Sequence, residues 1–240
     1  MSLLSNILLV DKPKGITSFD VIRLLRKKLG VWKMGHAGTL DPLASGLMII
    51  GVNDGTKKMA EFLKLPKIYV ADILLGKKSE TGDLEGKILE EKNTEHITDE
   101  MIRSVVAGFA GKHMLAVPMY SAIKVGGKTL YSIARKKEKG GVLTEKETNI
   151  APPIKEMEVI SAELLGIERT DETFRFGVQP RTGDGGNLVI KVKMEVTSGS
   201  YIRTLAEEFG NRLGVPAMLS SLRRIQIGKY SVEDPSVIRP

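Results

Sequence analysis

Short apolar segments of strand length and amphipathic helical segments follow one another irregularly along this chain, and this order limits its possible folds. The apolar runs at 7–10, 46–52 and 69–75 are typical of strands. Helical patterns lie between and after them without the strict strand–helix–strand repetition of a parallel sheet. The sequence therefore predicts an α+β fold rather than a doubly wound one. Further helices are expected over 56–63, 98–109 and 201–213, further strands over 159–167, 174–178 and 188–196, and a hairpin at 121–127.

The helix predicted over 17–30 has the clearest boundaries. Thr17 or Ser18 can cap its first turn, and Gly30 can end it. Its apolar residues are expected to share one inward face: Val21, Leu24, Leu25 and Leu29. The helix over 98–109 is expected to face the core with Met101, Ile102, Val105 and Val106. The last helix is expected to be capped by Ser200 and to end at Gly214.

Charge is distributed unevenly along the chain. The 36 basic and 29 acidic residues give a net charge of +7, and the basic excess lies in residues 1–50 and 101–150. Two basic segments in one chain favour a polyanionic partner such as nucleic acid. On charge alone, mild basicity without a specific partner stays open. The basic run 135–141 and the glycine-rich segment 180–187 are expected to be surface loops, and the first could equally be an RNA-contacting arm.

Cysteine is absent, which excludes disulfide frameworks, thiolate metal sites and cysteine nucleophiles. No apolar run approaches the ~20 residues of a membrane-spanning helix. No basic segment followed by a long apolar core marks the N-terminus as a signal peptide. These features predict a cytoplasmic protein.

The segment 35–46 is the most unusual part of the chain. It holds three glycines, His36, Thr39 and Asp41 directly before an apolar strand. Pro42 disfavours a helical conformation at Asp41, so the carboxylate is expected on a rigid loop suited to catalysis. The alternative is a capping aspartate with a surface histidine in a turn.

Familiar site motifs do not account for this segment. No phosphate-binding loop or nucleophile elbow occurs, and the glycine spacing is not that of a dinucleotide fingerprint. The histidines at 36, 96 and 113 lack metal-ligand spacing, so no metal site is expected. The residues alone predict an acid-bearing rigid loop in a basic protein.

Residues 35–46 resemble the signature loop of the TruB family of tRNA pseudouridine synthases. Further motifs of the family are resembled, in order along nearly the whole chain, by 11–18, 67–69, 79–83, 118–131, 198–203 and 222–224. The residues after Pro42 are more similar to the stand-alone bacterial enzymes than to the guide-RNA-dependent ones.

The resemblance implies a pseudouridine synthase fold, α+β with a central mixed, largely antiparallel sheet flanked by helices. It implies one catalytic domain over 1–240, with an RNA-binding insertion around 120–150. Because the chain stops soon after 222–224, the family's usual C-terminal RNA-binding domain is expected to be absent. The implied activity is isomerisation of the T-loop uridine 55 of tRNA to pseudouridine, without metal or organic cofactor. The implied partner is the tRNA T-arm, bound by a monomer without guide RNA or membrane.

Site residues follow from the same resemblance. Asp41 matches the catalytic aspartate, Arg203 an arginine that pairs with it, and Tyr69 the tyrosine that stacks on the flipped uracil. Substrate-binding positions are matched by His36, Tyr201, Leu222 and Lys12, the last as a phosphate contact. Taken singly, Tyr69 and Leu222 are more typical of a core, and Arg203 equally of a helix surface.

Two other functions compete with the synthase. One is a non-catalytic RNA-binding or tRNA-folding protein that kept the fold, which the intact Asp41 argues against. The other is a guide-RNA-dependent synthase that needs partner proteins. Nothing in the sequence resembles such dependence.

Overall fold

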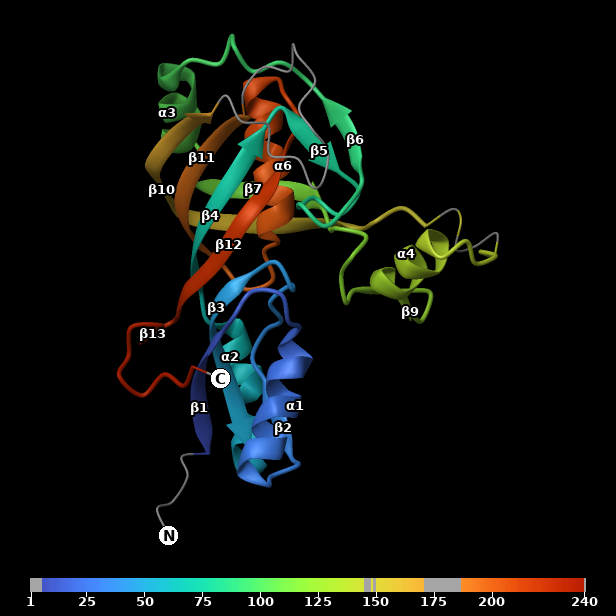
Figure 1. Ribbon diagram of the computed structural model, residues 1–240, viewed down its shortest axis with the longest axis vertical. Helices are drawn as coiled ribbons and strands as arrows, with labels where there is room; N and C mark the ends of the chain where they lie inside the picture. Colours follow the sequence, from blue (N-terminus) through green and yellow to red (C-terminus); the bar gives the residue numbers. More distant parts are fainter. Residues whose placement is uncertain (1–5, 145–147, 149, 171–186, 240) are drawn as a thin grey trace.

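A computed structural model describes residues 6–144, 148, 150–170 and 187–239 (Figure 1). The strand expected over 174–178 lies outside the described residues, and so does the glycine-rich segment 180–187 up to Asn187. Asn187 itself begins a strand. Among the described residues, no helix is long and apolar enough to span a membrane.

One large sheet organises the molecule. Its strands follow the order β1–β3–β12–β4–β11–β10–β7, with β2 paired to β3 and β13 paired to β12. Every pairing is antiparallel except the parallel one between β3 and β12. This confirms the α+β fold with a mixed, largely antiparallel sheet. The strands are β1 (Ile7–Lys12), β2 (Met34–His36), β3 (Ser45–Val52), β4 (Lys67–Leu75), β7 (Gly111–Ala116), β10 (Ile154–Thr170), β11 (Asn187–Val196), β12 (Ala217–Ile227) and β13 (Tyr230–Ser231).

Most helices pack on the sheet near the positions that the apolar patterns predict, whereas α4 was not predicted and projects from the body of the molecule. They are α1 (Ser18–Leu29), the 3-10 helix η1 (Asn53–Lys58), α2 (Met59–Lys64), α3 (Asp99–Ala107), α4 (Leu130–Glu138) and α6 (Ile202–Leu213). Alternate residues of β3 face opposite sides, so Met48 packs in the cluster that contains α1 and Leu47 in the cluster that contains α2. The two helices therefore lie on opposite faces of β3.

Thr17 caps α1, and Gly30 ends it in a left-handed conformation, as predicted. The predicted inward face is wrong at Leu24, which is 50% exposed. Ile22 is buried in its place, because the buried face is centred between Val21, Ile22 and Leu25, and Leu24 lies beyond its edge.

Two further details of the predicted helices are also wrong. Met101 is exposed rather than inward, because α3 buries Ile102 and Val106 and leaves the preceding residue at the edge. Ser200 does not cap α6: Tyr201 occupies the cap position without a side-chain hydrogen bond, and Ile202 begins the helix.

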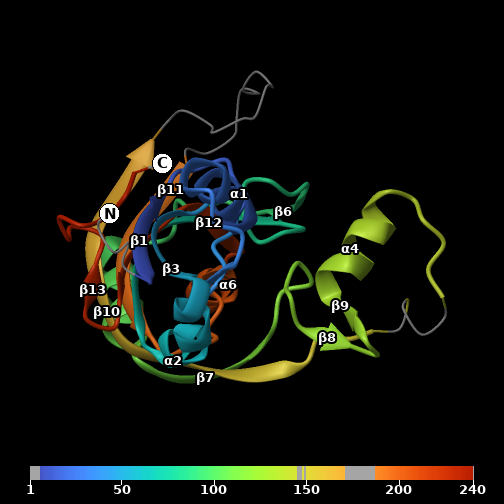
Figure 2. The same cartoon turned by 90° about the horizontal axis from the view of Figure 1, so that it is seen from below.

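Two hairpins project from the large sheet. The strands β5 (Lys77–Ser79) and β6 (Ile88–Glu91) form one, and β8 (Lys124–Val125) and β9 (Lys128–Thr129) form the other. The second confirms the predicted turn at 126–127. It leads into α4, and together they stand out from the body of the molecule in both views (Figures 1 and 2).

The expectation of a loop at 135–141 is wrong for its first half, since α4 extends to Glu138. Thr129 caps this helix by accepting a hydrogen bond from the Ser132 amide. Leu130, Ile133 and Ala134 give it a buried face, so a basic run that looks like a loop in sequence continues as helix.

The buried guanidinium of Arg224 joins β12 to β3. Its Nε donates to the Leu47 carbonyl at 2.7 Å and its Nη2 to the Gly38 carbonyl at 3.1 Å. Beside it, Gly46 has a φ of +111°, and a Cβ there would lie 2.7 Å from the Arg224 amide nitrogen and closer still to its carbonyl oxygen. The crossing of these strands therefore requires glycine at 46.

We expect Gly46→Ala to lower the free energy of unfolding by more than about 3 kcal/mol, because backbone strain and a clash with main-chain atoms add. Gly15→Ala is the matched control: Gly15 also has a positive φ of 87°, but nothing lies within 4 Å of its Cβ position. We expect it to cost only about 1–3 kcal/mol. Urea unfolding of both variants measures the two losses of stability. Equal losses would contradict the close approach of the Arg224 backbone to residue 46.

Candidate active site

The residues 37–44 that join β2 to β3, here called the Asp41 loop, are anchored on both sides of Asp41. The buried Ser18 hydroxyl accepts a hydrogen bond from the Leu40 amide at 2.8 Å and donates one to the Leu40 carbonyl at 3.0 Å. The Gly15 amide donates to the Pro42 carbonyl at 2.9 Å. The backbone is thus tied down at the residues before and after Asp41.

Arg203, in the first turn of α6, faces this loop. Its Nε lies 3.0 Å from Oδ2 of Asp41, and the two side chains are 7% and 37% exposed. Its remaining nitrogens donate to the carbonyls of Thr81 at 2.8 Å and Tyr120 at 2.9 Å. One buried guanidinium therefore holds three separate chain segments around a carboxylate that solvent can still reach.

The electrostatics leave Asp41 less acidic than a free aspartate. Burial raises the pKa of the Asp41 carboxyl, the Arg203 guanidinium opposes this, and the nearby Asp83 charge adds to the rise. Burial also raises the pKa of Glu85, with further contributions from Asp83 and Asp41. Several carboxylates thus gather around one arginine, and the guanidinium of that arginine favours the ionised form of Asp41.

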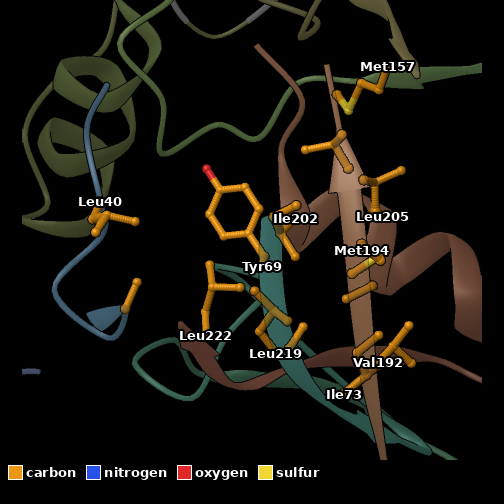
Figure 3. Close-up of a cluster of buried hydrophobic side chains, with 14 of the residues drawn as sticks. Leu40, Tyr69, Ile73, Met157, Val192, Met194, Ile202, Leu205, Leu219 and Leu222 are labelled. Carbon is orange, nitrogen blue, oxygen red and sulfur yellow. The ribbon is translucent and has the colours of Figure 1, made fainter. Parts of the chain in front are cut away.

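Tyr69 and Leu222 form an apolar floor beside the Asp41 loop. They lie on the adjacent strands β4 and β12, and both belong to the buried cluster that also contains Leu40 and Ile202. Figure 3 shows the Tyr69 ring next to Leu222, with its hydroxyl pointing away from that side chain. Since Leu40 immediately precedes Asp41, the loop that carries the carboxylate packs against the same buried cluster as Tyr69 and Leu222.

Tyr201 and His36 flank the site from different elements. Tyr201 is half-buried ahead of α6, and burial raises the pKa of its hydroxyl, on which the charges of Arg203 and Asp41 also act. His36 ends β2, where burial and the charge of Arg224 lower the pKa of its ring. The structure thus brings Tyr201 to the Asp41–Arg203 pair and places His36 towards Arg224.

Lys12 ends β1 and is held by the backbone of the turn that follows. It is fully buried, and its Nζ donates to the carbonyls of Pro13 at 2.9 Å and Ile16 at 2.7 Å. Burial lowers the pKa of Lys12 to about 8, although the charge of Asp41 acts in the opposite direction. The ammonium therefore stabilises the turn that supports the Asp41 loop.

Sequence reasoning missed several residues that build the site. The turn at 79–86 places Asp83, which is buried and accepts hydrogen bonds from the Thr81 hydroxyl and the Glu85 amide. The turn resembled a family motif but had no assigned role, because nothing local shows that it meets Arg203.

Within the described residues, no group of three or more acidic, histidine or cysteine side chains could hold a metal ion.

Comparison with known proteins points to one family. The sequence profile described as "TruB family pseudouridylate synthase (N terminal domain)" matches residues 26–168. A protein named tRNA pseudouridine synthase B from Endomicrobium trichonymphae is 37% identical over 231 residues, covering 96% of this chain and 88% of the relative. The protein of the same name from Desulfotalea psychrophila is 39% identical over 231 residues, covering 96% of this chain and 85% of the relative.

Solved structures share the fold. A chain in "Crystal Structure of a Cbf5-Nop10-Gar1 Complex" superposes with a TM-score of 0.64 at 26% identity, covering 97% of this chain and 51% of the other. A chain in "Structure of H/ACA RNP bound to a substrate RNA containing 2'-deoxyuridine" superposes with a TM-score of 0.63 at 24% identity, covering 97% and 50%. This chain spans about half the length of both.

We expect Ser18→Ala to lower the free energy of unfolding by about 2–4 kcal/mol, because the buried amide and carbonyl of Leu40 are both left without their partner. Ser132→Ala, which removes an exposed hydroxyl bonded to the Thr129 carbonyl, is the control and should change it by less than about 0.5 kcal/mol. Urea denaturation measures both. A Ser18→Ala variant as stable as the control would show that the Asp41 loop does not depend on this anchor.

Proposed function

The chain belongs to the TruB family of pseudouridylate synthases, and on this premise we propose that it isomerises uridine 55 in the T-loop of tRNA. The observation that carries the proposal is the Asp41–Arg203 pair: a solvent-reachable carboxylate held at 3.0 Å by a buried guanidinium, beside an apolar floor. The relatives named tRNA pseudouridine synthase B support tRNA as the substrate class.

In this reaction Asp41 acts where the sugar of the uridine joins its base. The bond from N1 of uracil to C1′ breaks, a bond from C5 to C1′ forms, the C5 proton leaves and N1 gains a proton. These atoms are inaccessible inside a folded loop, so the uridine must first leave the stack. A carboxylate is a suitable group because it can act as a nucleophile or stabilise developing positive charge on the sugar. Substrate and product have the same composition, so the conversion needs no oxidant or reductant.

Arg203 and the apolar floor divide the remaining tasks. Arg203 favours the ionised form of Asp41 and orients it through a charge-assisted contact. Tyr69 offers an aromatic surface on which the extruded uracil can stack, with Leu222 beneath it. Tyr201 lines the side of the site nearest Arg203. The interactions of Arg203 and Tyr201 with Asp41 support their assignments, and packing in the cluster that also holds Leu40 supports those of Tyr69 and Leu222.

The projecting hairpin and α4 are proposed to contact the T-arm as an RNA-binding insertion around 120–150. The last turn of α4 carries Arg135, Lys136 and Lys137, which suit a phosphate backbone. The Tyr120 carbonyl at the base of this insertion bonds Arg203, so RNA bound there would lie next to the reactive carboxylate.

We propose that the chain acts in the cytoplasm as a monomer, on free tRNA and without a guide RNA.

Asp41→Asn is expected to reduce pseudouridine formation by about 10³-fold or more, because the amide keeps the shape but cannot act as a carboxylate. Tritium release from a tRNA transcript labelled at C5 of uridine measures the rate. Asp54→Asn, which changes an exposed carboxylate paired with Lys57, is the control and should leave the rate unchanged. Full activity in Asp41→Asn would refute the catalytic role, and an inactive wild type that still binds tRNA would favour a non-catalytic RNA-binding protein.

Arg203→Gln is expected to move the acidic limb of the pH–rate profile to higher pH. The Arg203 guanidinium lowers the pKa of Asp41, so its removal raises that pKa further, and ionised Asp41 is lost at a higher pH as the solution is acidified. Arg212→Gln, on the same helix and paired with Glu208, is the matched control. We expect this variant to leave the acidic limb of the pH–rate profile in place. A limb that stays in place, or moves to lower pH, in Arg203→Gln would contradict the pairing.

A further inference from the structure

The outer side of α1 and the turn that follows it expose aromatic and basic residues together. Phe19 is 55% exposed and Trp32 is 78% exposed, although the inward face of α1 is well packed. Basic side chains lie between them along the helix and in the turn. We call this set the α1 surface: Phe19, Arg23, Arg26, Lys27, Lys28, Trp32 and Lys33.

Much of the positive charge on this surface is not balanced by neighbouring acids. Arg23 pairs with Asp20, the one acidic residue of the segment 18–33. Among the residues that the structure describes, Lys27, Lys28 and Lys33 form no ion pair. The helix dipole accounts for basic residues in the last turn of α1, but it does not account for an exposed tryptophan beside them.

The guanidinium groups on this surface are held in place before any ligand arrives. Phe19, Arg23 and Arg26 follow one another at positions i, i+4 and i+7, so they share one side of the helix. The Cζ atoms of Arg23 and Arg26 lie 5.9 and 5.7 Å from the centre of the Phe19 ring. The Nε of Arg26 is buried and has no hydrogen-bond partner within the described part of the chain. Arginines stacked in this way give up less freedom when they bind a phosphate.

Both ends of α1 lead to the reactive carboxylate. At its start, Ser18 is hydrogen-bonded to Leu40, the residue before Asp41. After its end, the turn that holds Trp32 enters β2, which continues into the Asp41 loop. In Figure 1, α1 and the projecting α4 lie on the same side of the molecule. A strand that leaves the site can therefore run along α1, over roughly 17 Å of helix.

We propose that the α1 surface binds the tRNA strand that flanks the target uridine, with phosphates on Arg26, Lys27 and Lys28 and an unpaired base stacked on Trp32. The inference rests on the proposed function for the identity of the RNA. Uncompensated basic groups beside an exposed indole match single-stranded RNA, because phosphates need cations and every base has a face that can stack. A protein partner would be expected to cover a larger apolar area than these separated rings offer.

Trp32 provides a direct test, because it is the one tryptophan of the chain. The 240-residue chain with Asp41→Asn is titrated with an unmodified tRNA transcript, so that binding is observed without turnover. We expect tryptophan fluorescence to change in proportion to binding, and bound tRNA to protect Trp32 from quenching by acrylamide. Anisotropy of end-labelled tRNA measures total binding in the same samples.

A pair of charge-matched variants tests the phosphate-binding role of the lysines. Lys27→Ala with Lys28→Ala is compared with Lys57→Ala with Lys58→Ala, which removes the same charge next to α2 on the opposite face of β3. We expect the first pair to weaken tRNA binding by about tenfold and to reduce the salt slope by roughly 0.7–0.9 for each phosphate that is no longer neutralised. The second pair of substitutions should change the tRNA affinity and the salt slope by less than about twofold each. Equal effects from the two pairs would contradict a local phosphate site.

The readouts separate this inference from the proposed function. If tRNA binds by anisotropy while the fluorescence and quenching of Trp32 stay unchanged, the α1 surface is not part of the RNA site, although the synthase proposal stands. If no tRNA binds, both proposals fail. Fluorescence change together with selective weakening in the Lys27 and Lys28 variant supports the inference.

Discussion

The arrangement of the site depends on the buried guanidinium of Arg203. A buried charge is tolerated only when it is fully paired, and this one is paired by the Asp41 carboxylate and the carbonyls of Thr81 and Tyr120. These partners come from three distant parts of the sequence, so Arg203 is fully paired only when α6 has met the Asp41 loop, the turn at 79–86 and the segment that holds Tyr120. The same ion pair that completes the fold also favours the ionised form of the carboxylate. Folding and reactivity are therefore coupled through one side chain.

Buried cations elsewhere act on the backbone instead of on a carboxylate. Arg224 donates to the carbonyls of Gly38 in the Asp41 loop and of Leu47 in β3. Lys12 donates to carbonyls in the supporting turn, and Lys67 to the carbonyls of Leu63 and Leu65. Burial and the charge of Arg224 lower the pKa of Lys67 to about 8, which shows how closely these groups are gathered. Because carbonyl partners are supplied by the chain itself, the loop holds its shape before substrate binds. A rigid loop is what an enzyme needs to present one carboxylate to an extruded base.

Much of this arrangement can be predicted from sequence where the signals are local. The cap at Thr17, the left-handed Gly30 and the apolar strand after the Asp41 loop are all local patterns, and the structure has each of them. The long strand β12 escaped prediction because serines and arginines interrupt its apolar residues, and only the fold shows that Arg224 is buried. The burial of Lys12 could not be predicted for a similar reason: a lysine near a turn looks exposed until its carbonyl partners are known. The pairing of Asp41 with Arg203 was expected from the family resemblance alone, since 162 positions of sequence separate them.

Chemical mapping of the modified nucleotide tests the central claim most directly. The purified chain alone is incubated with an unmodified tRNA transcript, and pseudouridine is located by carbodiimide adduct formation and primer extension. The account predicts a single new stop that reports position 55, formed without guide RNA or added protein. Stops at other uridines, or none until a guide RNA and partner proteins are supplied, would contradict it.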